Sequence, residues 1–375
     1  MKKEIRVGLI GSKFMGIAHS NAFRNANTWF ELPYNIKLKA ICATNNDNTL
    51  PQFAAKYGWE SFETDWRHMI DRDDIDLISV ATPGYLHKDM VIEAARKGKH
   101  ILCEKPLANT LSDAEAMLAE AEKAGIRHCC GFSYRFTPSM ALAKQFVQEG
   151  RLGRIFHVHA RYAQDWIVDP EFPMVWRLDK GLAGSGPLGD LSAHSVDACR
   201  FITGLDFTEV MGNMKTFIPE RKQAIDSEKK AVTVEDTAQF LVNFANGAVG
   251  NFESTRFASG RKNYNCIEVN GEYGSIVWNF EDQNYLSYYD NRHQPSEAGF
   301  RKINVTHDTH PYSGGYWPQG HGIGYADTFV IEVAEFIKAI AEDKPFSPDF
   351  KDGVCCQKVL DAVERSNTER KWILL

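Results

Sequence analysis

The first third of the chain alternates short apolar runs with helical segments, and this alternation restricts the possible folds more than any other feature. Strands are predicted at Ile5–Ile10, Lys37–Ala43, Asp76–Ala81, His100–Cys103 and Arg127–Gly131, with helices between them at Phe14–Arg24, Leu50–Tyr57, Tyr85–Lys99 and Leu111–Ala124. Strands joined by helices imply right-handed crossovers and a parallel sheet. Residues 1–131 are therefore predicted to form an α/β domain.

A change of pattern predicts a second domain over residues 132–375. A helix at Pro138–Gln148 and late helices at Asp327–Ala341 and Gly353–Asn367 enclose a series of strand-like runs at Ile155–Tyr162, Val210–Phe217, Ala231–Phe244, Ala248–Ser254, Asn265–Val269 and Ser275–Asn279. Asn246-Gly247 is a hairpin signal between two of these runs. The pattern predicts an α+β domain with an antiparallel sheet, which can supply one wall of a cleft.

Composition excludes several classes of protein. A length of 375 residues favours two domains, and a net charge of −6 argues against a nucleic-acid partner. No apolar run is long enough to span a bilayer, and Lys13 interrupts the apolar start, so neither a membrane partner nor a signal peptide is expected. The eight cysteines form no CxxC pair, which favours reduced thiols and a cytoplasmic location.

The turn after the first strand reads Gly11-Ser12-Lys13-Phe14-Met15-Gly16. In the dinucleotide fingerprint G-x-G-x-x-G, the glycines make a tight turn, let the backbone approach pyrophosphate and pack the helix closely. Gly11 and Gly16 fit the first and third roles, whereas Lys13 replaces the middle glycine and could face the pyrophosphate itself. The alternative is a glycine pair around an ordinary turn. With a strand before it and a helix after it, the turn predicts dinucleotide binding.

The tip of the second strand bears on the choice between NAD and NADP. An acidic residue there holds the 2′-hydroxyl of NAD, and its absence leaves room for the 2′-phosphate of NADP. The tip here is Ala43-Thr44-Asn45, and Thr44 and Asn45 could bind either group. Because no acidic residue stands at the tip, these residues slightly favour NADP. Both NAD and NADP remain candidate cofactors.

A lysine ends the fourth predicted strand, in Glu104-Lys105-Pro106, because Pro106 cannot continue the ladder. Ligands of open α/β sheets bind in the crevice outside the carboxyl ends of the strands. Lys105 is therefore expected to point into that crevice. The structural alternative is a solvated lysine at a strand end.

A second candidate lies in the glycine-rich run 181–194. Pro187 suits the first position of a helix, with Ser185 or Gly186 as its cap, so that Asp190 and His194 are neighbours on one helical face. An aspartate beside a histidine fixes its tautomer and raises its basicity, as a general base requires. The alternative is a surface Asp–His pair, or a capping aspartate with a packed histidine.

No metal site is predicted. Asp190 and His194 have no third ligand at helical spacing. In His157-Val158-His159, the two rings are expected on opposite faces of a strand, where they cannot share one ion.

Two aromatic segments in polar, glycine-rich surroundings are candidates for binding a substrate. They are Gln164-Asp165-Trp166 and the run from Tyr316 to Gly322, which contains His321. Aromatic faces beside amide, carboxylate and imidazole groups suit a polyol, which presents C–H faces and many hydroxyls. The alternative is that these aromatic residues belong to the core.

Together these segments resemble the glucose–fructose oxidoreductase/inositol dehydrogenase/MocA family over essentially the whole chain. The resemblance rests on the segments Gly11–His19, Ala81-Thr82-Pro83 with His87, Glu104-Lys105-Pro106, Tyr134–Pro138, Trp176-Arg177 and Gly184–Gly186 leading to Asp190 and His194. Within the family the chain is similar to the branch that acts on sugars, anhydrosugars and inositols.

The resemblance implies a Rossmann domain followed by an α/β domain whose open sheet makes a homo-oligomer, a dimer or a tetramer. It implies that Lys105 contacts the nicotinamide ribose and the reacting hydroxyl, and that Asp190 and His194 handle the proton. It places further residues near the cofactor, namely Ala81, Thr82, Pro83, His87, Glu104, Arg135, Trp176 and Arg177. It also puts a set near the substrate, namely Tyr134, Gln164, Trp166, Arg177 and His321.

The resulting hypothesis is hydride transfer between a secondary hydroxyl of a sugar, anhydrosugar or inositol and the nicotinamide of NAD or NADP. Either His194 or a Lys105 made less basic by burial could take the hydroxyl proton. One rival is an NAD-dependent glycosidase that oxidises its substrate transiently, for which Gly320-His321-Gly322 is the signal. The other is a nucleotide-sensing subunit without catalytic activity.

Overall fold

The chain folds into two compact units, each made of two stretches of sequence. The structure is a computed structural model and describes residues 2–44, 49–224 and 228–375. The first unit comprises Met1–Phe136 with Ile323–Cys355, and the second comprises Thr137–Gly322 with Cys356–Leu375. The predicted domains, 1–131 and 132–375, follow the chain without interruption, whereas a late segment returns to the first unit. That return requires contacts between residues far apart in sequence, which local patterns do not encode.

The first unit is built on a parallel sheet. Its described residues form six strands in the order β3-β2-β1-β4-β5-β6, with bounds β1 Lys3–Ile10, β2 Tyr34–Cys42, β3 Ser61–Glu63, β4 Leu77–Val80, β5 His100–Glu104 and β6 His128–Gly131. Every neighbouring pair is parallel. The chain winds outward in both directions from the centre, so the switch point lies between β1 and β4. The predicted parallel α/β fold is confirmed.

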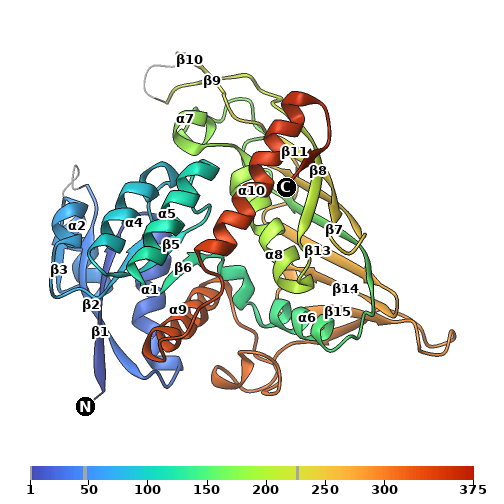
Figure 1. Ribbon diagram of the computed structural model, residues 1–375, viewed down its shortest axis with the longest axis horizontal. Helices are drawn as coiled ribbons and strands as arrows, with labels where there is room; N and C mark the ends of the chain where they lie inside the picture. Colours follow the sequence, from blue (N-terminus) through green and yellow to red (C-terminus); the bar gives the residue numbers. More distant parts are fainter. Residues whose placement is uncertain (1, 45–48, 225–227) are drawn as a thin grey trace. The chain divides into compact units, whose positions relative to one another are not determined.

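Helices cover this sheet, as right-handed crossovers require. They are α1 Phe14–Trp29, α2 Leu50–Tyr57, α3 Trp66–Ile70, α4 His87–Arg96, α5 Leu111–Ala124 and α9 Tyr325–Ala341. Helices α4 and α5 pack side by side, and α1 packs against α9, which comes from the late segment (Figure 1). The short β3 and α3 were not predicted, because each is too brief to show a clear periodicity.

The second unit contains a large, mostly antiparallel sheet. Its described residues form nine strands in the order β16-β15-β14-β13-β7-β12-β11-β8-β17, with bounds β7 Ile155–Ala163, β8 Phe207–Lys215, β11 Thr237–Phe244, β12 Val249–Thr255, β13 Tyr264–Gly271, β14 Gly274–Asn279, β15 Tyr285–Asp290, β16 Arg301–Asn304 and β17 Ile373–Leu374. Only β7 and β12 pair in parallel. A separate ribbon pairs β9 Glu220–Lys222 with β10 Lys229–Ala231.

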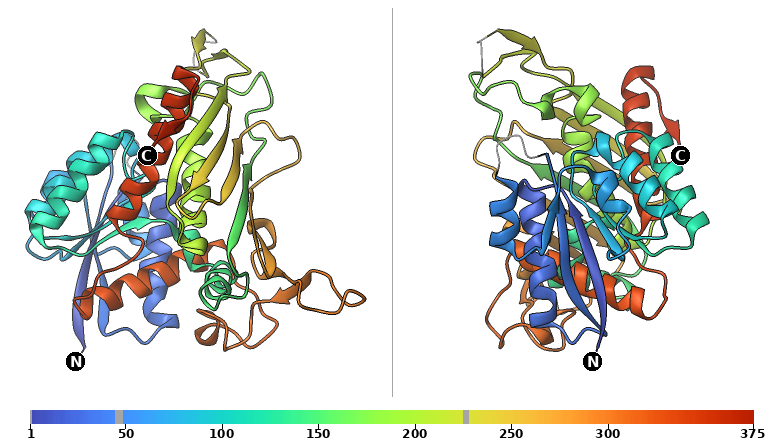
Figure 2. Two further views of the ribbon diagram at one scale, coloured as in Figure 1. Left: turned by 45° about the vertical axis from the view of Figure 1, so that its right-hand side comes forward. Right: turned by 90° about the vertical axis from the view of Figure 1, so that its left-hand side faces the viewer.

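One face of this sheet carries helices. Helix α8 (Ala193–Thr203) packs on β7 and β13, and α6 (Pro138–Gln148) packs on β14, β15 and α8 (Figures 1 and 2). The short α7 (Lys180–Ala183) lies near β9. Helix α10 (Phe350–Glu369) begins in the first unit and ends in the second. Alternate residues of the central strands β11, β13 and β14 are buried.

The predicted strand Ala231–Phe244 is wrong in its first half. Residues 232–236 form an irregular loop between β10 and β11. Two acidic side chains of this loop bind backbone N–H groups elsewhere. Glu235 Oε1 accepts from the N–H of Leu188 at 2.7 Å, and Asp236 Oδ2 accepts from Phe217 at 2.6 Å. Those bonds are available only in the folded chain, so the apolar run alone misled the prediction.

Two histidines at the starts of β5 and β6 predict a loss of stability in acid. The Nδ1 atoms of His100 and His128 accept from the N–H groups of Arg127 and Phe350, each at 3.1 Å. Burial lowers the pKa of both rings, so both are neutral in the folded state. The unfolded chain takes up these protons first, and stability therefore falls as the pH drops below the unfolded value of about 6.5.

We expect His128→Asn to weaken this pH dependence. Urea unfolding at about pH 7.5 and about pH 5.5 should show a loss of stability smaller than that of wild type, by up to about 1.4 kcal/mol per pH unit. His68→Asn, at an exposed ring, is the control for the effect of replacing a histidine by asparagine. An unchanged dependence in His128→Asn would show that folding does not alter the protonation of this ring between the two pH values.

None of the helices in the described ranges is both long and apolar enough to cross a membrane.

Candidate active site

In the first unit, the glycine turn meets the loop after β4 at the switch point of the sheet. Gly11 has φ +119°, and a Cβ there would lie 2.5 Å from the carbonyl oxygen of Ala81. A Cβ on Gly16 would lie 2.1 Å from the carbonyl oxygen of Gly11. The two glycines therefore allow a tight turn and close helix packing, as the fingerprint requires. This close packing brings the start of α1 directly behind the end of β1, where its free N–H groups suit a pyrophosphate.

The other residues of the turn are accessible. Lys13 is the N-cap residue of α1 and is exposed, with no hydrogen bond from its side chain to the helix. Ser12 and Met15 are half-buried, and Phe14 is 62% exposed and stacks on Tyr325 at 6.1 Å between ring centroids. Thr44 is exposed after β2, and Asn45 lies outside the described residues.

His87 joins the loops that follow β4 and β5. Its Nε2 lies 2.9 Å from the carbonyl oxygen of Thr82, and its Nδ1 lies 3.1 Å from that of Leu107. The ring is buried, whereas Ala81, Thr82 and Pro83 are partly exposed. The buried His87 therefore supports the predicted cofactor loop through its contact with the Thr82 carbonyl oxygen.

Lys105 lies directly after β5, and a buried chain of polar groups anchors the strand beside it. Glu104 Oε1 and His19 Nε2 are 2.7 Å apart, and His19 Nδ1 is 2.7 Å from Ser79 Oγ. Glu104 Oε2 also accepts from the backbone N–H of Lys105 at 3.2 Å. Glu104 thus supports the lysine from inside the unit, while Lys105 itself is half-buried.

Tyr134 and Arg135 are almost entirely buried in the first unit. Arg135 donates to Ser347 Oγ at 2.8 Å and pairs with Asp352 at 3.3 Å. Burial opposes ionisation of Asp352, but the charge of Arg135 and local hydrogen bonds outweigh it and lower its pKa. Tyr134 packs edge-on against Tyr325, with ring centroids 6.4 Å apart. These contacts assign Arg135 a bracing role inside the unit.

In the second unit, Asp190 lies in a turn of π-helix, and the predicted α-helix from Pro187 is wrong at its start. The π-helix spans Leu188–Ser192, and α8 begins only at Ala193. The N-cap residue of this turn is Pro187, so the predicted cap at Ser185 or Gly186 is wrong, although Ser185 Oγ accepts from the N–H of Gly189 at 2.9 Å. Glu235 captures the N–H of Leu188 from another part of the chain. Because π-helical bonds skip one more residue, α-helical spacing does not relate Asp190 to His194.

A buried arginine, Arg256, binds the Asp190 carboxylate. Its Nη2 donates to Asp190 Oδ2 at 2.8 Å, and its side chain is 1% exposed. Arg177, which stacks over Trp176 at 4.4 Å, lies in the same electrostatic environment. Loss of surrounding water lowers the pKa of Arg177, Asp190 opposes that shift and Arg256 adds to it. Trp176 and Arg177 are themselves exposed.

The predicted substrate residues of this unit are linked by contacts. Trp166 Nε1 donates to Gln164 Oε1 at 3.0 Å, and Gln164 Nε2 donates to Asn263 Oδ1 at 3.0 Å. Tyr162 donates to the same Asn263 oxygen at 2.6 Å, and its ring centroid lies 5.9 Å from that of the buried His194. The structure therefore brings together the segment 162–166 and the start of α8.

Two members of this group, Arg256 and Asn263, were not predicted from the sequence. Arg256 directly follows β12, and Asn263 directly precedes β13. No motif surrounds either residue. The only available signal was the position of Arg256 two residues after the predicted strand Ala248–Ser254, where a sheet edge begins.

His321 lies apart from these contacts. It is exposed, and its Nδ1 is 3.0 Å from the carbonyl oxygen of Pro318. Its loop borders a shallow surface pocket of about 440 Å³ with Thr306, His307 and His310. No described contact joins His321 to Gln164, Asp190 or His194.

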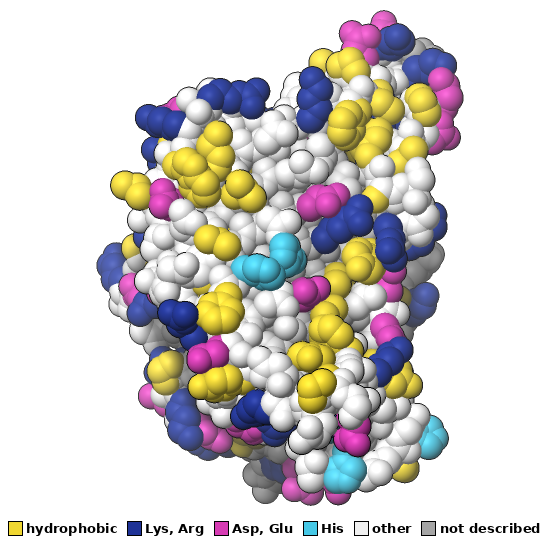
Figure 3. Space-filling model, turned by 90° about the vertical axis from the view of Figure 1, so that its right-hand side faces the viewer, with side chains coloured by type: hydrophobic (Ala, Val, Ile, Leu, Met, Phe, Trp, Pro, Cys, Tyr) yellow, Lys and Arg dark blue, Asp and Glu magenta, His cyan; other side chains and the backbone are white. Residues whose placement is uncertain are grey.

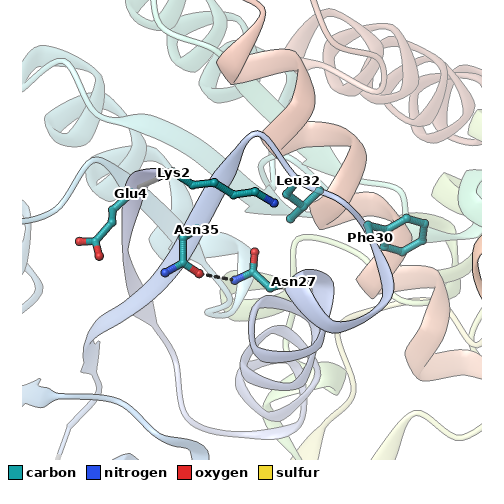
Figure 4. A pocket seen from close by; sticks show the side chains of 6 residues that line it. All are labelled: Lys2, Glu4, Asn27, Phe30, Leu32 and Asn35. Carbon is teal, nitrogen blue, oxygen red and sulfur yellow. Dashed lines mark hydrogen bonds between the residues drawn. The ribbon is translucent and has the colours of Figure 1, made fainter.

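Another pocket of the first unit, of about 380 Å³, lies at the wrong edge of the sheet to be the cofactor site (Figure 4). It is lined by Lys2, Glu4, Asn27, Phe30, Leu32 and Asn35. These residues flank the amino ends of β1 and β2, whereas the glycine turn follows the carboxyl end of β1.

The expectation that His157 and His159 face opposite sides of β7 is wrong. Their ring centroids are 4.5 Å apart, because residues i and i+2 of a strand share a face. Among the described residues, no group of three or more His, Cys, Asp or Glu side chains could hold a metal ion.

Comparisons with known proteins agree with this arrangement. Residues 5–132 match the oxidoreductase family with an NAD-binding Rossmann fold, and residues 140–277 match the GFO/IDH/MocA C-terminal domain. The chain is 39% identical to a levoglucosan dehydrogenase of Pseudarthrobacter phenanthrenivorans, covering 99% of this chain and 98% of that one.

Two solved structures are similar over 99% of both chains. One is an oxidoreductase domain protein from Kribbella flavida, with 49% identity and a TM-score of 0.96. The other is a levoglucosan dehydrogenase in complex with NADH and levoglucosan, with 41% identity and a TM-score of 0.95.

Proposed function

Because the chain belongs to the GFO/IDH/MocA family of oxidoreductases, we propose that it oxidises a secondary ring hydroxyl of an anhydrosugar or a similar pyranose or cyclitol, with NAD as hydride acceptor. The observation that carries the proposal is the meeting of Gly11 with Ala81 at the switch point, with Lys105 at the end of the next strand. The similarity to levoglucosan dehydrogenase supports the substrate class. NADH in a solved relative supports NAD over the NADP that the tip of β2 favoured.

The first unit fits the cofactor. Gly11 and Gly16 allow the tight turn and the close helix packing of the fingerprint, and the N–H groups at the start of α1 suit the pyrophosphate. Ser12, Lys13, Thr82 and Pro83 would hold the remaining parts, as would Thr44 after β2. The bound nicotinamide supplies the hydride acceptor.

Proton chemistry at a substrate hydroxyl is proposed for Lys105 in the first unit and for Asp190 and His194 in the second. The ammonium of Lys105 favours the alkoxide that forms as the proton leaves. His194 takes that proton in one assignment, with Asp190 supporting its positive charge, and Lys105 takes it in the other. Arg177, Gln164 and Trp166 would bind the ring and its other hydroxyls.

An activity screen tests the proposal. Levoglucosan, glucose and myo-inositol would each be incubated with NAD and with NADP, and absorbance of the reduced nicotinamide recorded. We expect the highest kcat/KM for levoglucosan with NAD. Absence of turnover with every sugar and cyclitol, in protein that binds NADH, would refute the proposed activity. To choose the base, His194→Asn is compared with wild type across pH, and loss of the acidic limb identifies His194.

We further propose that a second copy of the chain covers the helix-free face of the nine-stranded sheet. Leu241 is 52% exposed and Val249 is 50% exposed, and strand register puts them on the same face as His157, His159 and the Arg161–Glu253 pair. Figure 3 shows hydrophobic, charged and histidine side chains side by side on one face of the molecule. Light scattering after size exclusion should report a dimer or tetramer. Leu241→Lys should shift it toward the monomer.

A reducing, cytoplasmic location is proposed as well. All eight cysteines, each within the described ranges, are free thiols. Burial raises the pKa of Cys42 and Cys199 to about 12, so these thiols are unreactive.

A further inference from the structure

We propose that Arg256 is a positioning residue for the reaction, which holds the Asp190 carboxylate and the Trp166 indole in one fixed arrangement. The inference rests on the proposed function, because it concerns the same site. No sequence motif contains Arg256, and its proposed positioning role is inferred from its contacts in the structure.

The Arg256 guanidinium contacts the side chains of both Asp190 and Trp166. Its Nη2 donates to Asp190 Oδ2 at 2.8 Å, and its Cζ lies 5.0 Å from the centroid of the Trp166 ring. The Arg256 side chain is 1% exposed, whereas that of Asp190 is 36% exposed. Asp190 therefore presents one side to solvent, where a substrate can reach it, and its other side to a buried cation.

The burial of Arg256 is costly and needs an explanation. Its Nε and Nη1 are buried and find no hydrogen-bond partner within the described part of the chain. An arginine kept only for stability would have these donors satisfied, since each unsatisfied buried group is destabilising. Retaining the charge at this cost is consistent with a role in positioning Asp190.

Other charged groups surround this pair. Glu235 and Asp236 precede β11, and the charge of Arg256 acts on both carboxylates. Burial raises the pKa of both, with Arg256 opposing the shift. The charge of Asp190 raises the pKa of Arg177 against the effect of burial, and His194 follows Asp190 along the chain in α8. Arg256 donates a direct hydrogen bond to Asp190.

Two consequences for catalysis follow. Arg256 keeps Asp190 ionised and oriented, so that the carboxylate can support proton transfer. Through Trp166, which donates to Gln164 at 3.0 Å, the same guanidinium also fixes the segment proposed to bind the sugar. Loss of Arg256 should therefore lower kcat more than it raises KM, and should leave NADH binding in the first unit unchanged.

Arg256→Met and Arg256→Lys test this role. Met keeps the apolar stem and removes the charge, whereas Lys keeps the charge and lacks the planar fork. For Arg256→Met we expect kcat to fall about 100-fold, within the usual range for proton-transfer groups. The acidic limb of the kcat/KM profile should move to higher pH, because a carboxylate without its cation is protonated more readily. Arg256→Lys should restore part of kcat and most of the wild-type profile.

Arg292→Met is the matched control. Arg292 also pairs with a carboxylate, Asp290 at 2.7 Å, and lies over an aromatic ring, Tyr273 at 5.6 Å, but on an exposed hairpin. This variant should keep wild-type kinetics.

The outcomes separate the two proposals. An inactive wild type that binds NADH refutes the proposed function, whereas an active wild type with Arg256→Met kinetics equal to Arg292→Met overturns the role of Arg256. If Arg256→Met does not fold by circular dichroism, Arg256→Lys decides, and wild-type kcat with an unmoved pH profile in that variant overturns the inference.

Discussion

Lys105→Met is expected to lower kcat/KM for the best polyol on the order of 10³-fold, because the side chain then lacks the charge that favours the alkoxide. The apolar stem remains, and Glu104 still accepts from the backbone N–H of residue 105, so the strand end should keep its position. Steady-state kinetics with saturating NAD measure the effect. NADH fluorescence titration should show a much smaller loss of affinity than the loss of turnover.

Lys97→Met is the control for this variant. Lys97 caps the end of α4 and pairs with Asp71 at 2.6 Å on the surface. Its loss should leave the kinetics at wild-type values. A Lys105→Met enzyme with near wild-type kcat/KM would exclude Lys105 from the chemistry and leave His194 as the sole candidate for the base.

Gly16→Ala should strongly weaken cofactor binding. Its Cβ would lie 2.1 Å from the carbonyl oxygen of Gly11, which is backbone and cannot rotate away. Helix α1 or the turn must then shift, at a cost of about 1–3 kcal/mol or more in stability. Because the shift occurs where the pyrophosphate would bind, we expect NADH affinity to fall about 100-fold or more.

Gly299→Ala separates this effect from the general consequences of replacing a glycine. A Cβ on Gly299 meets nothing within 4 Å, so both the melting temperature and NADH affinity should stay at wild-type values. Thermal melts and fluorescence titrations measure the two quantities. Unaltered NADH affinity in Gly16→Ala would show that the cofactor does not use this turn.

Local patterns were sufficient for the elements that carry the cofactor chemistry. In the first unit, helices α2 and α5 match their predicted bounds, and the predicted strands end within one residue of β1, β2, β4, β5 and β6. Apolar periodicity and glycine turns act over a few residues, so they can be read from a short window. Local sequence was therefore enough to assign Lys105, Gly11 and Gly16 to the carboxyl edge of the sheet.

Contacts between residues far apart in the sequence could not be predicted from local patterns. His19 and Glu104 are 85 positions apart, and Arg256 and Asp190 are 66 apart. Neither pair has a shared motif, and the packing of separate elements brings each pair together. The π-helical turn at Asp190 has the same origin, since Glu235 binds its first N–H from 47 positions away.

The sequence by itself determined the parallel α/β unit, the antiparallel sheet that follows it, the glycine turn and the lysine at a strand end. These follow from side-chain periodicity and from backbone conformations that only glycine or proline favours. The tertiary structure alone decided what stands behind those residues: Glu104 and His19 beside Lys105, and Arg256 beneath Asp190. Buried polar groups need partners wherever the fold can provide them, and the position of those partners is a property of packing, not of the local sequence.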